Sequence, residues 1–208
     1  MKHRPLILAV ILALFIPLGL SACSGAAPSV TITTGPTEVE ATEFEGVNLT
    51  PINQQRNNGL AGKQVLDRAT YTLTVDGMVD HPLTLSYDDL LAYPQIDRLE
   101  DLNCVDGWFF TAKWTGPSLK AIFTDAGVKP EATIVIFHTT DAPAGFCSLD
   151  LNYIMENDII IALKDNDITL PPERGFPFQV AAMSYGYKWA KWVTRIEISD
   201  HSDSLGVW

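Results

Sequence analysis

The sequence has few of the residues and motifs that mark common classes of functional site. It contains 3 cysteines, 4 histidines and 14 lysines and arginines against 25 aspartates and glutamates, for a formal net charge of −11. It has no Gly-x-Ser-x-Gly nucleophile elbow, no glycine-rich dinucleotide motif and no Walker loop, and no cysteine stands at zinc-ligand spacing from a histidine or another cysteine. The acidic balance excludes nucleic acid as a partner, because phosphate binding requires a basic face.

The N-terminal apolar run is also short for a membrane-spanning helix. It covers residues 6–20 behind Lys2 and Arg4, whereas a span needs roughly 20 apolar residues. Small residues precede Cys23, as in the cleavage sites of lipoprotein signal peptides. We therefore expect residues 1–22 to be a lipoprotein signal peptide and Cys23 to be lipidated, with an uncleaved anchor helix as the alternative. Either reading predicts an extracytoplasmic protein that is held to the cell membrane, by lipid in the first case.

Composition divides the rest of the chain into three parts. Residues 23–50 are rich in small and polar residues without sustained periodicity, which indicates a flexible tether. Residues 51–200 are long enough for one domain, and residues 201–208 are expected to form a C-terminal tail.

Short apolar patterns within the domain predict more strands than helices. Ser86 can cap a short helix that ends before Pro94, and Gly127 can end a helix that opens at residues 116–118. A third short helix is expected at residues 149–155. Strands are expected at residues 71–77, 81–85, 133–137, 159–163, 168–170, 178–183 and 193–199. Interspersed strands and helices predict a single strand-rich, mixed α+β domain rather than a wound parallel sheet.

The domain has two cysteines, Cys104 and Cys147. In an exported protein the first hypothesis for such a pair is a disulfide, and two free thiols are the alternative. Cys104 lies near Trp108, Trp114 and Gly116, which allow tight packing around it. A thiolate in rigid surroundings is a strong donor for a soft or high-valent metal.

A second group of chemically interesting residues lies near the C-terminus. Arg174, Lys188 and Lys191 are cations in an otherwise acidic domain, and they stand among several prolines and glycines. Cations on glycine-containing loops suit a bound anion such as a phosphate. The alternative is that Lys188 and Lys191 are surface charges that flank a strand.

These two groups together resemble the molybdopterin-binding oxidoreductase domain of the sulfite oxidase family. The resemblance rests on residues 103–108 with 114–116, residues 137–139, and residues 170–179 with 185–197, in that order. It covers residues 53–200 and is similar in pattern to the periplasmic methionine-sulfoxide reductase catalytic subunits. It implies a sulfite-oxidase-type fold and a molybdopterin-type molybdenum cofactor.

The resemblance assigns roles residue by residue. Cys104 matches the molybdenum ligand and is therefore the candidate catalytic and metal-binding residue. Gln179 stands where the family more often has arginine, and we expect Arg174 or Arg56 to offset this difference. The positions that match cofactor contacts are Asn53, Arg56, Asn57, Thr139, Arg174, Gln179, Trp189, Ala190 and Lys191.

The implied chemistry is oxygen-atom transfer, with reduction of a sulfoxide or another small molecule as the expected reaction. The protein supplies one thiolate, orientation and electrostatics, while the cofactor carries the reaction. The sequence has no heme-attachment Cys-x-x-Cys-His motif, so a separate electron-transfer partner is expected. The alternative is a non-catalytic surface binding lipoprotein that retains the fold without the metal.

Overall fold

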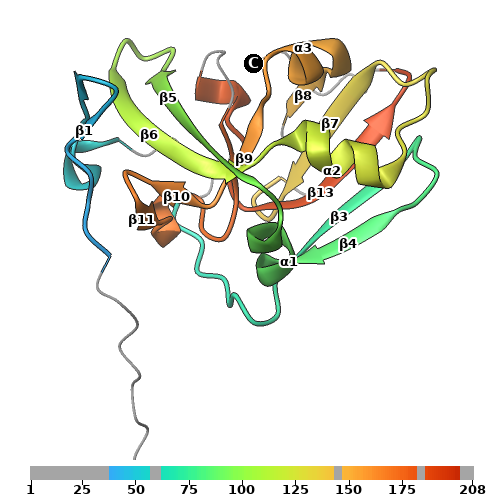
Figure 1. Ribbon diagram of the computed structural model, residues 1–208, viewed down its shortest axis with the longest axis horizontal. Helices are drawn as coiled ribbons and strands as arrows, with labels where there is room; N and C mark the ends of the chain where they lie inside the picture. Colours follow the sequence, from blue (N-terminus) through green and yellow to red (C-terminus); the bar gives the residue numbers. More distant parts are fainter. Residues whose placement is uncertain (1–37, 57–61, 143–146, 182–185, 202–208) are drawn as a thin grey trace, which may run out of the picture. The chain divides into compact units, whose positions relative to one another are not determined.

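The computed structural model describes residues 38–56, 62–142, 147–181 and 186–201, which belong to one structural unit (Figure 1). The predicted signal peptide, Cys23 and Asn57 lie outside the described residues. Within those ranges, no helix has both the length and the apolar character that crossing a membrane requires.

A five-stranded sheet forms one part of the domain. Its central strand, β13, pairs in parallel with β3 and antiparallel with β7. Alternate residues of β3, such as Leu73 and Val75, are fully buried, which explains why this segment forms a strand with one face on the core. In spatial order the strands are β4 (Leu83–Ser86), β3 (Thr72–Gly77), β13 (Val193–Ser199), β7 (Ile134–Thr139) and β8 (Cys147–Asp150).

A long β-hairpin organises a second, four-stranded sheet. The hairpin consists of β5 (Gln95–Asn103) and β6 (Phe109–Pro117), and β10 (Lys164–Asp165) and β11 (Ile168–Thr169) extend it beside β6. A separate antiparallel pair joins β9 (Ile160–Ala162) to β12 (Gln179–Ala181). Figure 1 shows β9 between the hairpin and the five-stranded sheet.

The helices are short and begin at side-chain caps. The helix α1 (Tyr87–Ala92) starts with a reciprocal capping box between Ser86 and Asp89. The helix α2 (Leu119–Ala126) is capped by Ser118 and ends at Gly127 with φ +65°. The helix α3 (Leu151–Glu156) is capped by Asp150. The first two expected helices are confirmed, and the third begins later than expected because residues 147–150 pair with β7.

The expected tether is wrong for residues 38–50, which belong to the folded unit. They contain the antiparallel strands β1 (Glu43–Phe44) and β2 (Val47–Asn48), and Leu49 is buried. The carboxylate of Glu38 accepts hydrogen bonds from the backbone and side chain of Thr169. These contacts join residues more than a hundred positions apart, so local composition does not reveal them.

The β6–β9 contact leaves no room for a side chain at Gly116. A Cβ atom built there would lie 1.8 Å from the carbonyl oxygen of Ile161. Gly116→Ala should therefore lower the free energy of unfolding by about 3 kcal/mol, as for an overpacked core. Urea unfolding measures this change, and Thr84→Ala on an exposed strand position should stay within about 0.5 kcal/mol. An equally stable Gly116→Ala protein would contradict the close approach of these strands.

Candidate functional site

Cys104 begins the loop that closes the β5–β6 hairpin. Asn103 and Phe109 form the last strand pair, and within the loop the Cys104 amide donates to the Trp108 carbonyl at 2.9 Å. The Gly107 amide donates to the Cys104 carbonyl at 3.0 Å, and Gly107 has φ +83°, which glycine adopts without strain. The thiol is free and half-buried. The sequence therefore places one thiol on a hydrogen-bonded turn at the tip of a paired hairpin.

A row of aromatic rings leads from this turn into the core. The rings of Trp108 and Phe110 stack with centroids 6.2 Å apart, and Phe110 lies 6.2 Å from Trp114. Trp114 meets Trp189 edge to face at 5.2 Å. Phe110, Trp114 and Trp189 are buried, whereas Trp108 is partly exposed. The row connects the cysteine turn to the C-terminal segment through packed apolar surface.

Gly186 brings the two sequence motifs into direct contact. It begins the short 3-10 helix η3 (Gly186–Lys188). A Cβ atom at this position would lie 2.8 Å from Leu102 Cδ2 and 3.0 Å from the Asn103 carbonyl oxygen. A glycine is therefore needed for the C-terminal segment to approach the backbone that leads into Cys104.

Three predicted cofactor contacts come together as a buried polar cluster, which we call the basic cluster: Arg174, Gln179 and Lys191. Their relative exposures are 1%, 0% and 3%. Gln179 and Lys191 form an antiparallel bridge, and Gly175 lies so close that its Cβ would be 3.0 Å from Lys191 Cβ. The guanidinium carbon of Arg174 lies 5.0 Å from the centre of the Phe110 ring, which links the basic cluster to the hairpin.

Several polar atoms in and beside the basic cluster lack a hydrogen-bond partner among the described residues. They are Arg174 Nη1, both amide atoms of Gln179, Gln55 Oε1 and Asp165 Oδ2. Each unpaired buried polar atom destabilises a protein by about 1–3 kcal/mol, so few are retained without a reason. Donors and acceptors that are unpaired in one region fit a polar ligand with groups of both kinds, such as a phosphorylated pterin.

The electrostatics of the region also fit an anion. Burial lowers the pKa of Lys191 well below its ordinary value, and the charge of Arg174 lowers it further. Burial also lowers the pKa of Arg174, which the neighbouring Asp165 partly opposes. A bound anion would stabilise both cations and raise the pKa of Lys191.

The other predicted contacts are placed differently. Asn53 and Arg56 are exposed, although the Arg56 carbonyl accepts a hydrogen bond from Arg174. Thr139 is buried, and its hydroxyl donates to Asp141 at 2.6 Å, a residue whose charge acts on Lys191. Asn57 lies outside the described residues.

The backbone of the predicted segment 189–191 is tied to a neighbouring strand. The Ala190 carbonyl accepts from the Val180 amide of β12 at 2.8 Å, and Trp189 and Ala190 are both buried. The Lys188 side chain reaches β8, where its ammonium donates to the Ser148 carbonyl at 2.9 Å. Lys191 Nζ donates to the Glu173 carbonyl at 3.3 Å and so stays within the basic cluster.

The disulfide hypothesis for Cys104 and Cys147 is wrong, since both thiols are free. The Cys147 thiol is buried and donates to the Lys188 carbonyl, with the atoms 3.4 Å apart. Burial raises its pKa to about 12, so it remains a neutral thiol. Cys147 thus has a hydrogen-bonded place in the core, and the half-buried Cys104 is the candidate metal ligand.

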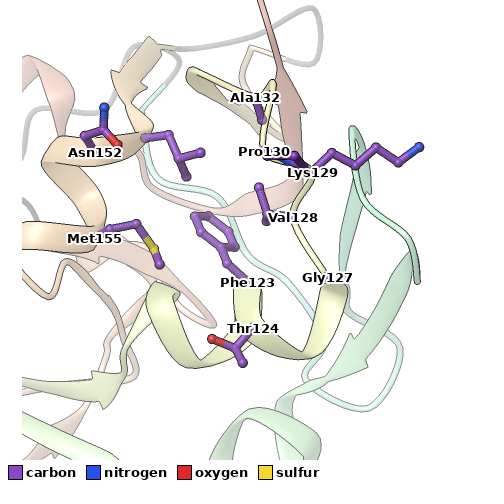
Figure 2. A pocket seen from close by; sticks show the side chains of 10 residues that line it. Phe123, Thr124, Gly127, Val128, Lys129, Pro130, Ala132, Asn152 and Met155 are labelled. Atoms are coloured by element: carbon purple, nitrogen blue, oxygen red, sulfur yellow. The ribbon is translucent and has the colours of Figure 1, made fainter.

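A surface depression of about 500 Å³ lies elsewhere, between α2, α3 and residues 127–132 (Figure 2). Phe123, Val128 and Met155 supply apolar parts of its wall, and none of the predicted site residues lines it. The candidate site is therefore defined by the hairpin turn and the basic cluster, and this depression is separate from both.

The chain belongs to the family described as the oxidoreductase molybdopterin binding domain, which matches residues 60–208. The expected class of enzyme, its molybdenum cofactor and the sulfite-oxidase-type fold are thereby confirmed. The chain is 34% identical over 144 residues to the uncharacterized oxidoreductase YuiH of Bacillus subtilis, covering 68% of this chain and 71% of YuiH.

Two relatives carry a more specific name, protein-methionine-sulfoxide reductase catalytic subunit MsrP. The one from Gluconobacter oxydans is 30% identical, covering 63% of this chain and 47% of the relative. The one from Campylobacter jejuni is 25% identical, covering 80% and 63%. The sulfane dehydrogenase SoxCD of Paracoccus pantotrophus has the same fold, with a TM-score of 0.67 at 21% identity over 90% of this chain and 56% of that chain. The chain thus spans less than two thirds of these three proteins.

Asp165, which the sequence analysis did not single out, should make the free energy of unfolding depend on pH. Burial raises its pKa to about 7, whereas the pKa of the same carboxyl in the unfolded chain is about 4. Between these two pH values the folded protein keeps a proton on Asp165 that the unfolded chain has lost. The free energy of unfolding therefore falls by roughly 1.4 kcal/mol for each pH unit as the pH rises. Asp165→Asn removes the effect.

Urea unfolding of cofactor-free wild type and Asp165→Asn between pH 4 and 8 tests this. The free energy of unfolding of the wild type, minus that of the variant, should fall from about pH 4 to 7 and then level off. A constant difference would show that the folded carboxyl titrates at its ordinary pKa.

Proposed function

We propose that this protein is an extracytoplasmic, lipid-anchored, molybdopterin-dependent oxidoreductase in which Cys104 ligates molybdenum. The observation that carries the proposal is a free thiol on the hydrogen-bonded turn of a hairpin whose Phe110 contacts a buried basic cluster with unpaired polar atoms. Molybdenum prefers soft thiolate donors, and the phosphate of the cofactor requires cations. Both requirements are met by segments that Gly186 brings into contact.

The chain would supply one metal ligand, Cys104. The remaining ligands would come from the cofactor. Arg174, Gln179 and Lys191 would hold its polar and anionic groups. We assign Thr139 to the same site through Asp141, and Asn53, Arg56, Asn57, Trp189 and Ala190 to its rim and backbone contacts.

The proposed reaction is reduction of a sulfoxide, as the names of the two reductase relatives suggest. A sulfoxide takes up two electrons and two protons and yields a thioether and water. When bound, the cofactor supplies oxygen-atom transfer. Cys104 would tune the metal without attacking the substrate, and the aromatic row from Trp108 inward would keep water from the buried groups.

A neutral substrate fits the charges around the turn better than an anion such as sulfite. Asp101 and Asp106 lie near Cys104 in sequence and face solvent, while Arg174 is buried in the basic cluster. Arg56 places its guanidinium carbon 6.0 Å from the Trp108 ring centre. Electrons would come from a separate redox partner.

Replacement of Cys104 tests the metal assignment. Cys104→Ser should lose bound molybdenum, because a serine oxygen is a poorer ligand for this centre. Its sulfoxide reductase activity with an artificial electron donor should fall by at least about a hundredfold. Cys147→Ser is the matched control, since a hydroxyl can donate to the same Lys188 carbonyl. Metal analysis and circular dichroism measure occupancy and fold. A Cys104→Ser enzyme that keeps its metal and rate would overturn the assignment.

Replacement of Cys23 tests the anchor. Cys23→Ala should move the protein from the membrane fraction to the soluble extracytoplasmic fraction, or leave it unprocessed, because no thiol can accept the lipid. Fractionation with and without detergent, together with the mass of the mature N-terminus, measures this. Membrane attachment of an unlipidated, uncleaved Cys23→Ala chain would favour an anchor helix.

A further inference from the structure

Asp165 connects two parts of the chain that flank the candidate cofactor site. It lies on β10 directly opposite Trp114 of β6, so both side chains stand on the same face of the sheet. Both residues are fully buried. Trp114 belongs to the aromatic row, which places Asp165 beside the path from the hairpin to the C-terminal segment.

The first oxygen of Asp165 holds the segment that precedes Arg56. Asp165 Oδ1 accepts a hydrogen bond from Gln55 Nε2 at 3.1 Å, and the same amide nitrogen donates to the Thr50 carbonyl at 3.1 Å. Asn166, the next residue in the turn, donates to that carbonyl at 3.0 Å. Residues 50–55 are thereby fastened to the turn after β10.

The Asp165 carboxyl also lies within reach of the charges of the basic cluster. Arg174 and Lys191 both lie close enough for their charges to act on the Asp165 carboxyl. Oδ2 itself is buried and has no hydrogen-bond partner in the described part of the chain. A buried carboxylate is expensive to retain, and an asparagine could accept the Gln55 hydrogen bond equally well. The carboxyl thus differs from an asparagine in the charge that it can present to Arg174 and Lys191.

Arg174 completes a closed arrangement around the site. Its guanidinium donates to the Arg56 carbonyl, one residue after Gln55. The segment 50–56 is thus held at one point by Asp165 through Gln55 and at the next by Arg174. Displacement of either contact would move the carbonyl and side chain of Arg56 relative to the basic cluster.

We propose that Asp165 is a positioning residue that couples segment 50–56 to Arg174 and Lys191 and so slows release of the cofactor. The role rests on the proposed function and acts through Gln55 and the two cations. Loss of a group that supports a metal ligand typically changes metal affinity 10- to 100-fold, and we take the lower end of this range for a group that supports the polar end of the cofactor.

The test compares cofactor retention in protein purified from its own membrane. Asp165→Ala removes both interactions. Gln55→Leu removes the hydrogen bonds to Asp165 and to the Thr50 carbonyl and leaves the Asp165 carboxyl in place. Asp167→Asn, as a control, removes a charge from the half-buried end of the same turn, where Asp167 pairs with Lys113. Molybdenum and pterin per chain are followed over time after dilution into metal chelator. We expect release to be about tenfold faster in Asp165→Ala and Gln55→Leu and unchanged in Asp167→Asn.

Two further readouts separate positioning from a merely structural role. The double variant should release cofactor little faster than Asp165→Ala alone, because both changes break one coupled interaction. The rise in melting temperature from cofactor-free to loaded protein should be smaller in both single variants, whereas a structural role would lower both temperatures equally. Wild-type retention in the two variants, or additive effects, would overturn the role of Asp165. A wild type that never carries molybdenum or pterin would instead overturn the proposed function itself.

Discussion

The burial of Arg174 and Lys191 within reach of each other's charge is the constraint on which much of this structure depends. Two cations in a low-dielectric interior repel, and each loses several kcal/mol of hydration. The charges of Asp141, Asp165 and Glu173 oppose this effect at Lys191, and burial raises the pKa of Asp165 to about 7. Gly175 lets the loop pack on Lys191, and the Trp192 indole holds the Pro172 carbonyl at 3.0 Å. The fold therefore holds Arg174 and Lys191 at defined positions inside the protein.

The turn that carries Cys104 is partly open to solvent, unlike the buried basic cluster. Cys104 is half-buried at a hairpin tip, next to the exposed side chains of Val105 and Phe109. The hairpin behind it is rigid, because nine residue pairs join β5 to β6. A large cofactor with a reactive metal at one end and an anion at the other needs this division, with substrate access at one end and enclosure at the other. Phe110 belongs to both parts, since it stacks on Trp108 and lies beneath Arg174.

The sequence predicts local features of this architecture well and long-range ones poorly. The helix α2 follows from Ser118, Gly127 and one apolar face, all of which are local signals. The strand β5 was missed because acidic residues are spread along it and hide its alternation. Residues 38–50 were assigned to the tether because their contacts are with residues such as Asn166 and Thr169. The family resemblance predicts roles for Arg174, Gln179 and Lys191, which the structure buries in one region, whereas Asp165 lies in a turn that carries no motif and stands out only through its burial.

The position of β13 in the middle of the five-stranded sheet affects how the domain can be made. This strand is among the last described residues, yet it separates β3 from β7 and pairs with both. Until it arrives, β3 and β7 each expose an unpaired edge, which is a site for misassociation with other chains. Contacts between residues so distant along the chain also slow folding, because loop closure precedes the stabilising contacts. Synthesis must therefore pass residue 199 before this sheet can close, so β3 and β7 wait on the nascent chain, each with one open edge, for more than fifty residues after β7 is made.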